Sequence, residues 1–188
     1  MAQAESLTQV DIDQVLRYLT PKKFGYRDRA LLLTSCWSGM RVGEISSLLV
    51  KDVVNDDGSI KNEVRLSVDQ TKGKHPRTVF LPEKLRTELK AYLAQKFVKS
   101  SDTPLFFSSK RIGFTPNTLC QHFFWLYRKA GIPGASSHSG RRTFITNLAN
   151  KGVSVRVLAS LAGHRSIAVT QRYIDVNDDI KRNAIELI

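Results

Sequence analysis

Apolar residues recur at helical spacing over much of this chain. Near its start, Thr8 and Asp11 stand three positions apart, as in a capping box, and apolar residues then follow every three or four positions up to residue 19. A second, more apolar helix is predicted over residues 26–38, where Gly39 ends it, and a short amphipathic helix over residues 41–49. The start of the chain is therefore predicted to be helical.

The spacing of the hydrophobic residues changes between residues 53 and 81. Residues 64–68 alternate apolar and polar side chains, residues 78–81 are strand-forming types, and turn-like stretches occur at 55–58 and 72–76. We expect a small antiparallel β-sheet of about three strands here.

Helical spacing returns in the rest of the chain. Further helices are expected after Pro82, over residues 116–129, 140–150 and 153–162, and in the segment after Gly163 that holds Tyr173. With 41% hydrophobic residues among 188, the chain can bury one sizeable core, and no internal repeat divides it. The predicted fold is α+β: a single, mostly helical domain over residues 1–188 with the small sheet at one edge.

The charge balance points to a polyanionic partner. Lys and Arg number 29 against 17 Asp and Glu, which gives a formal net charge of +12 and a pI near 10.0. Such a surplus is typical of proteins that bind polyanions. Nucleic acid, an anionic membrane surface and simple solubility all remain open on charge alone.

The N-terminus and the cysteines indicate the compartment. Residues 1–7 are polar and do not resemble a secretory signal, and no apolar run has the length of a membrane span. Cys36 and Cys120 are far apart and lack CxxC spacing, so neither a disulfide framework nor a zinc site is predicted. Cys36 lies in an apolar stretch and is expected to be a core residue. A reducing, cytoplasmic setting fits these features best.

Four groups of residues carry the candidate chemistry. In chain order they are GMRVGEI (39–45), TKGK (71–74), HSGRRT (138–143), and LAGH (161–164) followed by QRY (171–173). Each group alone is a weak signal, but their ordered conjunction resembles the signature of the tyrosine recombinases of the phage integrase family. The resemblance covers nearly the whole chain, from the first predicted helix past Tyr173.

The resemblance implies a site-specific recombinase. Members of that family cleave and rejoin double-stranded DNA through a covalent 3'-phosphotyrosine, without metal, ATP or any other cofactor. The implied assembly is a homo-tetramer on paired DNA sites, weakly associated or monomeric without DNA and with no membrane partner. The implied setting is the cytoplasm of a prokaryotic cell, with the gene carried by the cell, a phage or a mobile element.

The arginines and His138 suit a phosphodiester substrate on physical grounds as well. Negative charge increases in the five-coordinate transition state, and the forked guanidinium groups of Arg41 and Arg141 can hold the non-bridging oxygens. His138 and Arg141 stand at i and i+3, near a predicted helix N-terminus, where phosphate is favoured. His138 is therefore expected to assist proton transfer or to hold a phosphate oxygen.

The departing 5'-oxygen needs a proton donor. Lys72 lies in the turn between two strand-like stretches, and a lysine with a lowered pKa can supply that proton. Lys74, two residues away, is the competitor, and the resemblance favours Lys72.

The remaining roles follow mainly from the resemblance. Tyr173 is the expected nucleophile. His164, where the family has His or Trp, is expected to donate a hydrogen bond to the phosphate, and Glu44 to position its neighbours. The residues expected to contact DNA are Lys74, Arg77, Arg142 and Arg172.

Each of these residues also has a purely structural interpretation, without a catalytic role. Arg41, Arg141 and Lys72 taken singly are most often solvated or paired surface residues. Tyr173 fits an amphipathic core position, and His164 fits the C-terminal cap of a helix. A zinc site at His138 and His164 is not expected, because no third or fourth ligand is suitably spaced.

Two departures from the family pattern and two rival functions stay open. Gly140 stands where relatives carry a bulky apolar residue, and the N-terminal core-binding domain that completes a DNA clamp in most relatives is absent from this sequence. A type IB topoisomerase resembles this set but has a lysine in place of His138. A non-catalytic DNA-binding regulator with the same fold is the other alternative, and the intact catalytic set argues against it.

Overall fold

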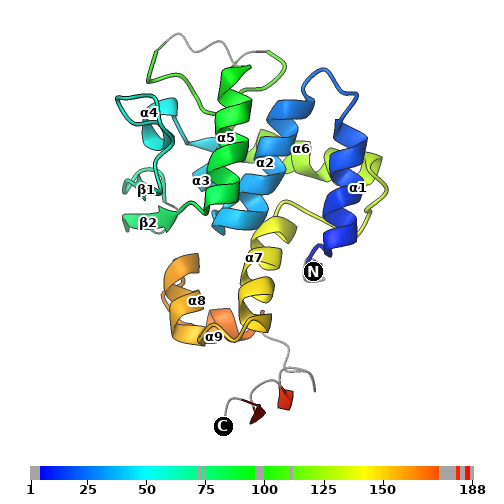
Figure 1. The fold of residues 1–188 in the computed structure, drawn as a ribbon, viewed down its shortest axis with the longest axis vertical. Helices are drawn as coiled ribbons and strands as arrows, with labels where there is room; N and C mark the ends of the chain where they lie inside the picture. Colours follow the sequence, from blue (N-terminus) through cyan, green and yellow to red (C-terminus); the bar gives the residue numbers. More distant parts are fainter. Residues whose placement is uncertain are drawn as a thin grey trace.

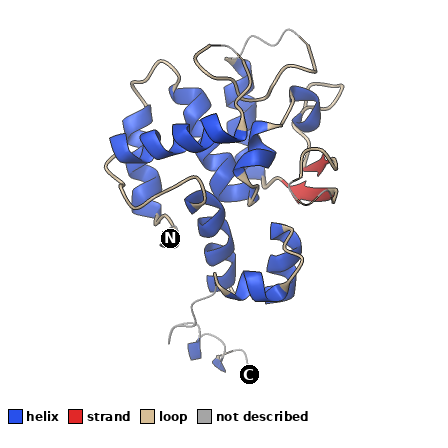
Figure 2. Ribbon diagram, turned by 180° about the vertical axis from the view of Figure 1, so that it is seen from behind, coloured by secondary structure: helices blue, strands red, loops and turns tan. Residues whose placement is uncertain are grey.

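The computed structural model describes residues 5–71, 73, 75–95, 100–110, 112–173, 181–182 and 185–186. Helices dominate this part of the chain, and a small antiparallel sheet lies at one edge (Figures 1 and 2), so the predicted fold class is confirmed. The helices are α1 (Gln9–Leu19), α2 (Gly25–Ser38), α3 (Val42–Ser46), α4 (Val50–Val53), α5 (Glu83–Ala94), α6 (Pro116–Lys129), α7 (Ser139–Asn150), α8 (Val155–Ala162) and α9 (Ile167–Gln171). The strands are β1 (Glu63–Leu66) and β2 (Arg77–Phe80).

Local start signals account for the helices that the pattern predicted well. The Asp11 amide donates to the Thr8 hydroxyl oxygen at 3.1 Å, and the Thr8 amide donates to the Asp11 carboxylate at 2.8 Å, which completes the predicted capping box of α1. Helix α6 has Thr115 as its N-cap and Pro116 at its first position, where proline loses no hydrogen bond.

The region between residues 41 and 81 is less regular than predicted. The single helix expected over residues 41–49 is wrong in extent: α3 ends at Ser46, and α4 starts separately because the Leu49 amide donates to Asp52. In the sheet, Glu63 pairs with Phe80 and Leu66 with Arg77. In place of a third strand, an isolated bridge joins Val54 and Ile60 among the described residues.

Helix α2 forms the centre of the core. It packs against α1, α3, α5 and α7, and almost all of its residues are buried, including Cys36 as expected. A Cβ on Gly140 of α7 would lie 1.7 Å from the Ser35 hydroxyl of α2. The two helices therefore approach too closely at this point for any larger residue, which explains why glycine replaces the bulky residue expected from the family.

Helices α7, α8 and α9 lie in the lower part of the molecule in Figure 1. Helix α7 runs down from the helical body, and α8 and α9 fold back beside it. Gly39 ends α2 with φ of 65° and Gly163 ends α8 with φ of 62°, both left-handed conformations that glycine adopts readily. The ends of α2 and α8 meet near the start of α7, where Arg141 donates to the carbonyls of Gly39 and Ala162. No helix in the described ranges is long and apolar enough to cross a membrane.

Candidate active site

A cavity of about 820 Å³ gathers the predicted catalytic residues. Five of the six line it: Arg41, His138, Arg141, His164 and Tyr173. Lys72, the sixth, lies outside the described residues. Its neighbours Thr71 and Gly73 line a second hollow of about 760 Å³, which shares Arg41 and His164 with the first. The turn predicted to carry the acid therefore borders the same site.

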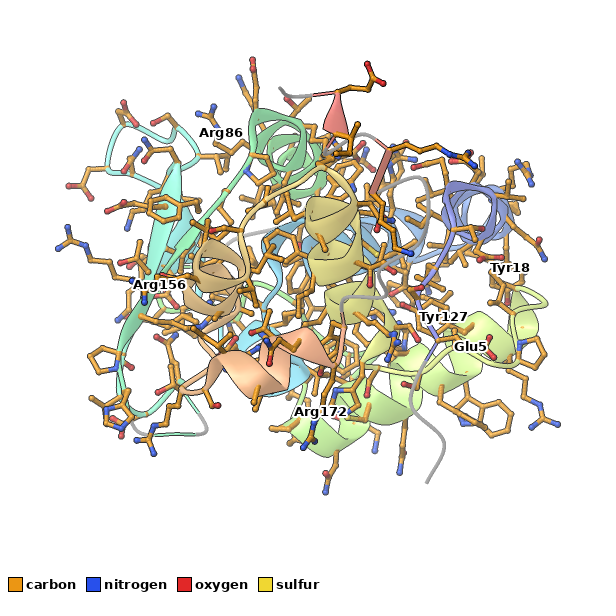
Figure 3. The ribbon with its side chains drawn as sticks, turned by 90° about the horizontal axis from the view of Figure 1, so that it is seen from below. Glu5, Tyr18, Arg86, Tyr127, Arg156 and Arg172 are labelled. Atoms are coloured by element: carbon orange, nitrogen blue, oxygen red, sulfur yellow. The ribbon has the colours of Figure 1, made fainter. Side chains whose placement is uncertain are left out.

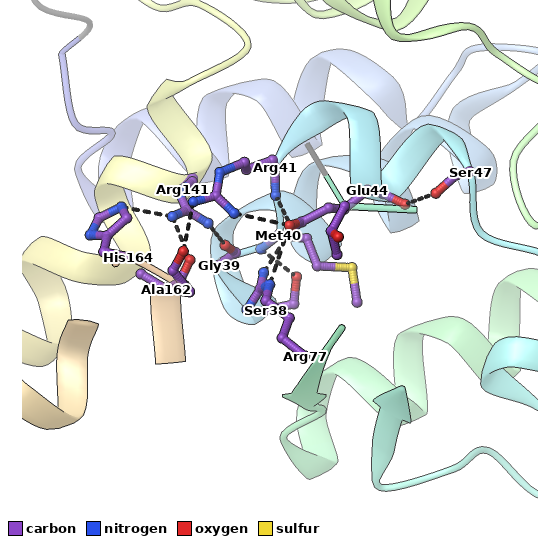
Figure 4. A network of polar contacts seen from close by, with 12 residues as sticks. Ser38, Gly39, Met40, Arg41, Glu44, Ser47, Arg77, Arg141, Ala162 and His164 are labelled. Atoms are coloured by element: carbon purple, nitrogen blue, oxygen red, sulfur yellow. Dashed lines mark hydrogen bonds and ion pairs between the residues drawn. The ribbon is translucent and has the colours of Figure 1, made fainter. Parts of the chain in front are cut away.

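Three arginines are fixed by the C-terminal end of α8. The last carbonyls of a helix have no partner within the helix and carry the negative end of its dipole, so they attract cationic donors. The three bonds join Arg77 to Leu161 (2.8 Å), Arg141 to Ala162 (2.6 Å) and Arg41 to Gly163 (2.9 Å). Arg141 also donates to the carbonyl of Gly39 at the end of α2. Figure 4 shows Arg41 and Arg141 side by side above these ends.

Glu44 binds two of these arginines. It is 1% exposed and accepts from the Arg41 amide (2.7 Å) and guanidinium (3.0 Å) and from the Arg77 guanidinium (2.7 and 3.2 Å). Burial alone raises the pKa of Glu44, but the hydrogen bonds and charges of Arg77 and Arg41 outweigh it and hold the pKa below the ordinary 4.5. Glu44 is thus an anion that orients arginines, in keeping with the supporting role expected for it.

Arg141 remains a cation in spite of its surroundings. Burial, followed by the charge of Arg41, lowers its pKa from 12.5 to about 9. That value is still above neutral pH, so the cavity presents two neighbouring positive forks. Their mutual repulsion would be relieved by a bound anion such as a phosphate oxygen.

The hydrogen bonds of His164 define its tautomer. Its Nε2 lies 2.8 Å from Arg141 Nη2, and because a guanidinium can only donate, Nε2 accepts. Its Nδ1 therefore carries the proton and donates to the hydroxyl of Thr170 at 2.8 Å. Burial, with the charges of Arg141, Arg41 and Arg77, lowers the pKa of His164 from 6.5 to about 4, so the ring is neutral at pH 7. Donation to a phosphate, as expected from the sequence, would require the proton on the other nitrogen.

Tyr173 stands just after α9, in a turn. Its amide donates to the Thr170 carbonyl at 2.9 Å, and its ring stacks on the His164 ring with centroids 5.7 Å apart and 22° between planes. The guanidinium of Arg142 lies 5.5 Å from the centroid of the same ring. The side chain is half-buried at the cavity wall and is not a core aromatic.

His138 caps the start of α7, one turn before Arg141. Its amide donates to the Ser136 hydroxyl at 3.2 Å, and its side chain is exposed along the cavity. Within the described residues, no group of three His, Cys, Asp or Glu side chains could hold a metal ion. Among the other histidines, His75 is exposed, whereas His122 is packed and lies 2.8 Å from Asp28.

The residues expected to contact DNA have different surroundings. Arg77 is 11% exposed and is committed to Glu44 and Leu161. Arg142 is half-buried against Tyr173, and Arg172 is exposed beside α9 (Figure 3). Lys74 lies outside the described residues. DNA contact by any of the four stays a prediction.

The structure adds two features that sequence reasoning missed. Thr170 is fully buried and accepts the hydrogen bond of His164 Nδ1, and Arg77 joins β2 to α3 and α8. In the sequence, nothing marks Thr170 except its position three residues before Tyr173. The sequence shows only the charge of Arg77, and its burial between Glu44 and Leu161 reveals the structural task.

The chain has curated relatives among the tyrosine recombinases. XerA of Pyrococcus furiosus is 31% identical over 186 residues, covering 97% of this chain and 61% of the relative. XerC of Pelobacter propionicus is 29% identical over 175 residues, covering 90% of this chain and 56% of the relative. The chain thus spans about three fifths of the length of these relatives.

Solved structures share the fold. The crystal structure of XerA recombinase has a TM-score of 0.75 at 24% identity and covers 100% of this chain and 64% of its own. The Tn1549 transposon integrase in complex with a circular intermediate DNA has a TM-score of 0.80 at 19% identity, with 100% and 67% covered. The sequence matches the Phage integrase family over residues 5–179. This match extends over nearly all of the chain and includes all the residues of the cavity, so the chain belongs to the Phage integrase family.

Proposed function

We propose that residues 1–188 form the catalytic domain of a site-specific tyrosine recombinase, which cleaves and rejoins double-stranded DNA through a 3'-phosphotyrosine on Tyr173. The observation that carries the proposal is the shared cavity, in which a tyrosine stands beside two arginine forks and two histidines. Curated relatives over nearly the whole chain are named tyrosine recombinases, which supports the same activity.

In the proposed reaction the phosphate lies between Arg41 and Arg141. The Tyr173 oxygen forms a bond to phosphorus and gives its proton to His138, while the bond to the 5'-oxygen breaks and that oxygen takes a proton from Lys72. The arginines stabilise the additional negative charge of the five-coordinate transition state. The phosphotyrosine keeps the energy of the broken ester, so attack by a 5'-hydroxyl rejoins the strand without ATP.

The two arginines supply the positive charge that a metal-dependent nuclease obtains from its metal ion. Arg41 and Arg141 are already held by carbonyls of α2 and α8 and by Glu44, so they need little reorganisation when phosphate binds. We therefore propose a reaction independent of metal and of any cofactor.

The proposed partner is double-stranded DNA. The net charge of +12 and the DNA complexes of structural neighbours, such as the Tn1549 integrase, support it. Assembly as a homo-tetramer on paired sites, in the cytoplasm where DNA is available, belongs to the same proposal.

Covalent trapping tests the function. The chain is incubated with a randomised duplex library in EDTA, protein–DNA adducts that survive denaturation are recovered, and the DNA is sequenced. We expect an adduct at a shared sequence with the wild-type protein, and none with Tyr173→Phe, which lacks only the hydroxyl. Adducts that require magnesium, or that persist in Tyr173→Phe, contradict the proposal. DNA binding without any adduct would favour the non-catalytic regulator, and cleavage without sequence preference would favour the topoisomerase.

A further inference from the structure

Arg142 contacts the candidate nucleophile from the neighbouring helix. It follows Arg141 on α7, and its guanidinium lies 5.5 Å from the centroid of the Tyr173 ring, within the range of a cation–π interaction. One turn further along α7, the Thr146 hydroxyl donates to the Tyr173 carbonyl at 3.4 Å. Two successive turns of α7 therefore hold the residue that bears the phenol.

The packing of Arg142 is unfavourable for a residue that serves stability alone. Its Nη1 is buried, and no hydrogen-bond partner for this nitrogen is present in the described part of the chain. A buried donor without a partner destabilises a fold, and a neutral side chain of similar length would avoid that cost. The neighbouring Arg141, by contrast, donates to two carbonyls and to His164. The two adjacent arginines thus have different tasks.

We infer that Arg142 is a positioning residue for Tyr173, an inference that rests on the proposed function. Its guanidinium holds the phenol ring against α7, beside the His164 ring on which the phenol stacks. Its fixed charge lies next to the ring whose oxygen loses a proton when the bond to phosphorus forms. In the rejoining step the same charge stabilises the tyrosine oxygen as it departs. This task is distinct from the direct DNA contact expected from the sequence, which stays a prediction.

The test measures single-turnover adduct formation at saturating concentrations of the duplex recovered by covalent trapping. Arg142→Gln and Arg142→Met remove the charge, and Arg142→Lys keeps it. Arg17→Gln, at an exposed position on α1, is the matched control for the loss of one positive charge. We expect both neutral variants to form the adduct about tenfold more slowly, and the lysine variant to recover part of that rate. DNA affinity should fall no further than in Arg17→Gln.

Two further readouts separate positioning from other roles. A duplex with sulfur in place of the bridging 5'-oxygen removes the need for an acid, and it should leave the neutral variants slow because their defect lies on the nucleophile side. Arg142→Met should melt at or above the wild-type temperature, since it deletes the buried Nη1 donor, for which the described residues supply no partner. A wild-type rate in the neutral variants, rescue by sulfur, or a lysine variant as slow as both neutral ones overturns the inference. Failure of the wild-type chain to form an adduct removes the proposed function, and this inference with it, whereas a defect confined to the Arg142 variants leaves the proposed function intact.

Discussion

At the scale of single residues, His164 is a neutral base between two fixed partners. Burial and nearby arginines lower its pKa from 6.5 to about 4, so between these values the unfolded chain binds a proton that the folded chain does not. The free energy of unfolding should therefore fall as the pH drops from about 6.5 to about 4. Thermal unfolding measured across this range should show a smaller pH dependence in His164→Gln than in the wild type. Equal slopes in the two proteins would refute the protonation state assigned to His164.

The acid and the nucleophile can be separated chemically. Tyr173→Phe and Lys72→Ala should both suppress cleavage of an ordinary duplex, the first for lack of the attacking hydroxyl and the second because the 5'-oxygen leaves without a proton. A bridging sulfur leaves readily as thiolate, so adduct formation should return in Lys72→Ala and stay absent in Tyr173→Phe. Both are measured as the fraction of DNA linked to protein after denaturation. Rescue of Lys74→Ala in place of Lys72→Ala would show that Lys74 is the acid.

At the scale of secondary-structure elements, Arg77 joins β2 to α3 and to the end of α8. It supplies two hydrogen bonds to the buried Glu44 and one to the Leu161 carbonyl. Among the described side chains, Arg77→Met leaves Glu44 with Arg41 as its one charged hydrogen-bond partner, and we expect it to lower the free energy of unfolding by about 1.5–3 kcal/mol. Denaturant unfolding measures this change, with Arg65→Met on the exposed face of β1 as the matched control. The double variant Arg77→Met, Glu44→Gln should be more stable than the sum of the two single changes predicts. Strict additivity would argue against the pairing.

At the scale of the whole molecule, the net charge of +12 governs encounter with DNA. Each phosphate contact releases counterions, so with about three contacts the affinity should fall about 40-fold between about 50 and about 200 mM salt. Fluorescence anisotropy on a labelled duplex measures this slope. Lys74→Gln should reduce the slope by about one, while Arg17→Gln on the distant α1 should leave it unchanged. An affinity that does not respond to salt would contradict a phosphate-based interaction.

The sequence by itself determined most of the helices and selected five residues that share one cavity. Capping residues such as Thr8, glycines such as Gly39 and Gly163, and apolar spacing act over one or two helical turns, so they can be read from neighbouring residues. The ordered motifs likewise identified Arg41, His138, Arg141, His164 and Tyr173, all of which the fold brings to one cavity. The break between α3 and α4 escaped prediction, because Leu49 there forms a bridge with Pro104, far away in the chain. The described residues form two strands where about three were expected.

Only the tertiary structure decided what each charged residue does. Arg77 and Leu161 are 84 positions apart, and Arg41 and Gly163 are 122 apart, so no local pattern could assign the end of α8 as their common partner. The neutral tautomer of His164 and the contact of Arg142 with Tyr173 likewise depend on burial and on the approach of α7 to α9. Residue types fix which chemistry is available. The packing of distant helices fixes which donors remain for the substrate, because every hydrogen bond made within the protein removes one from that set.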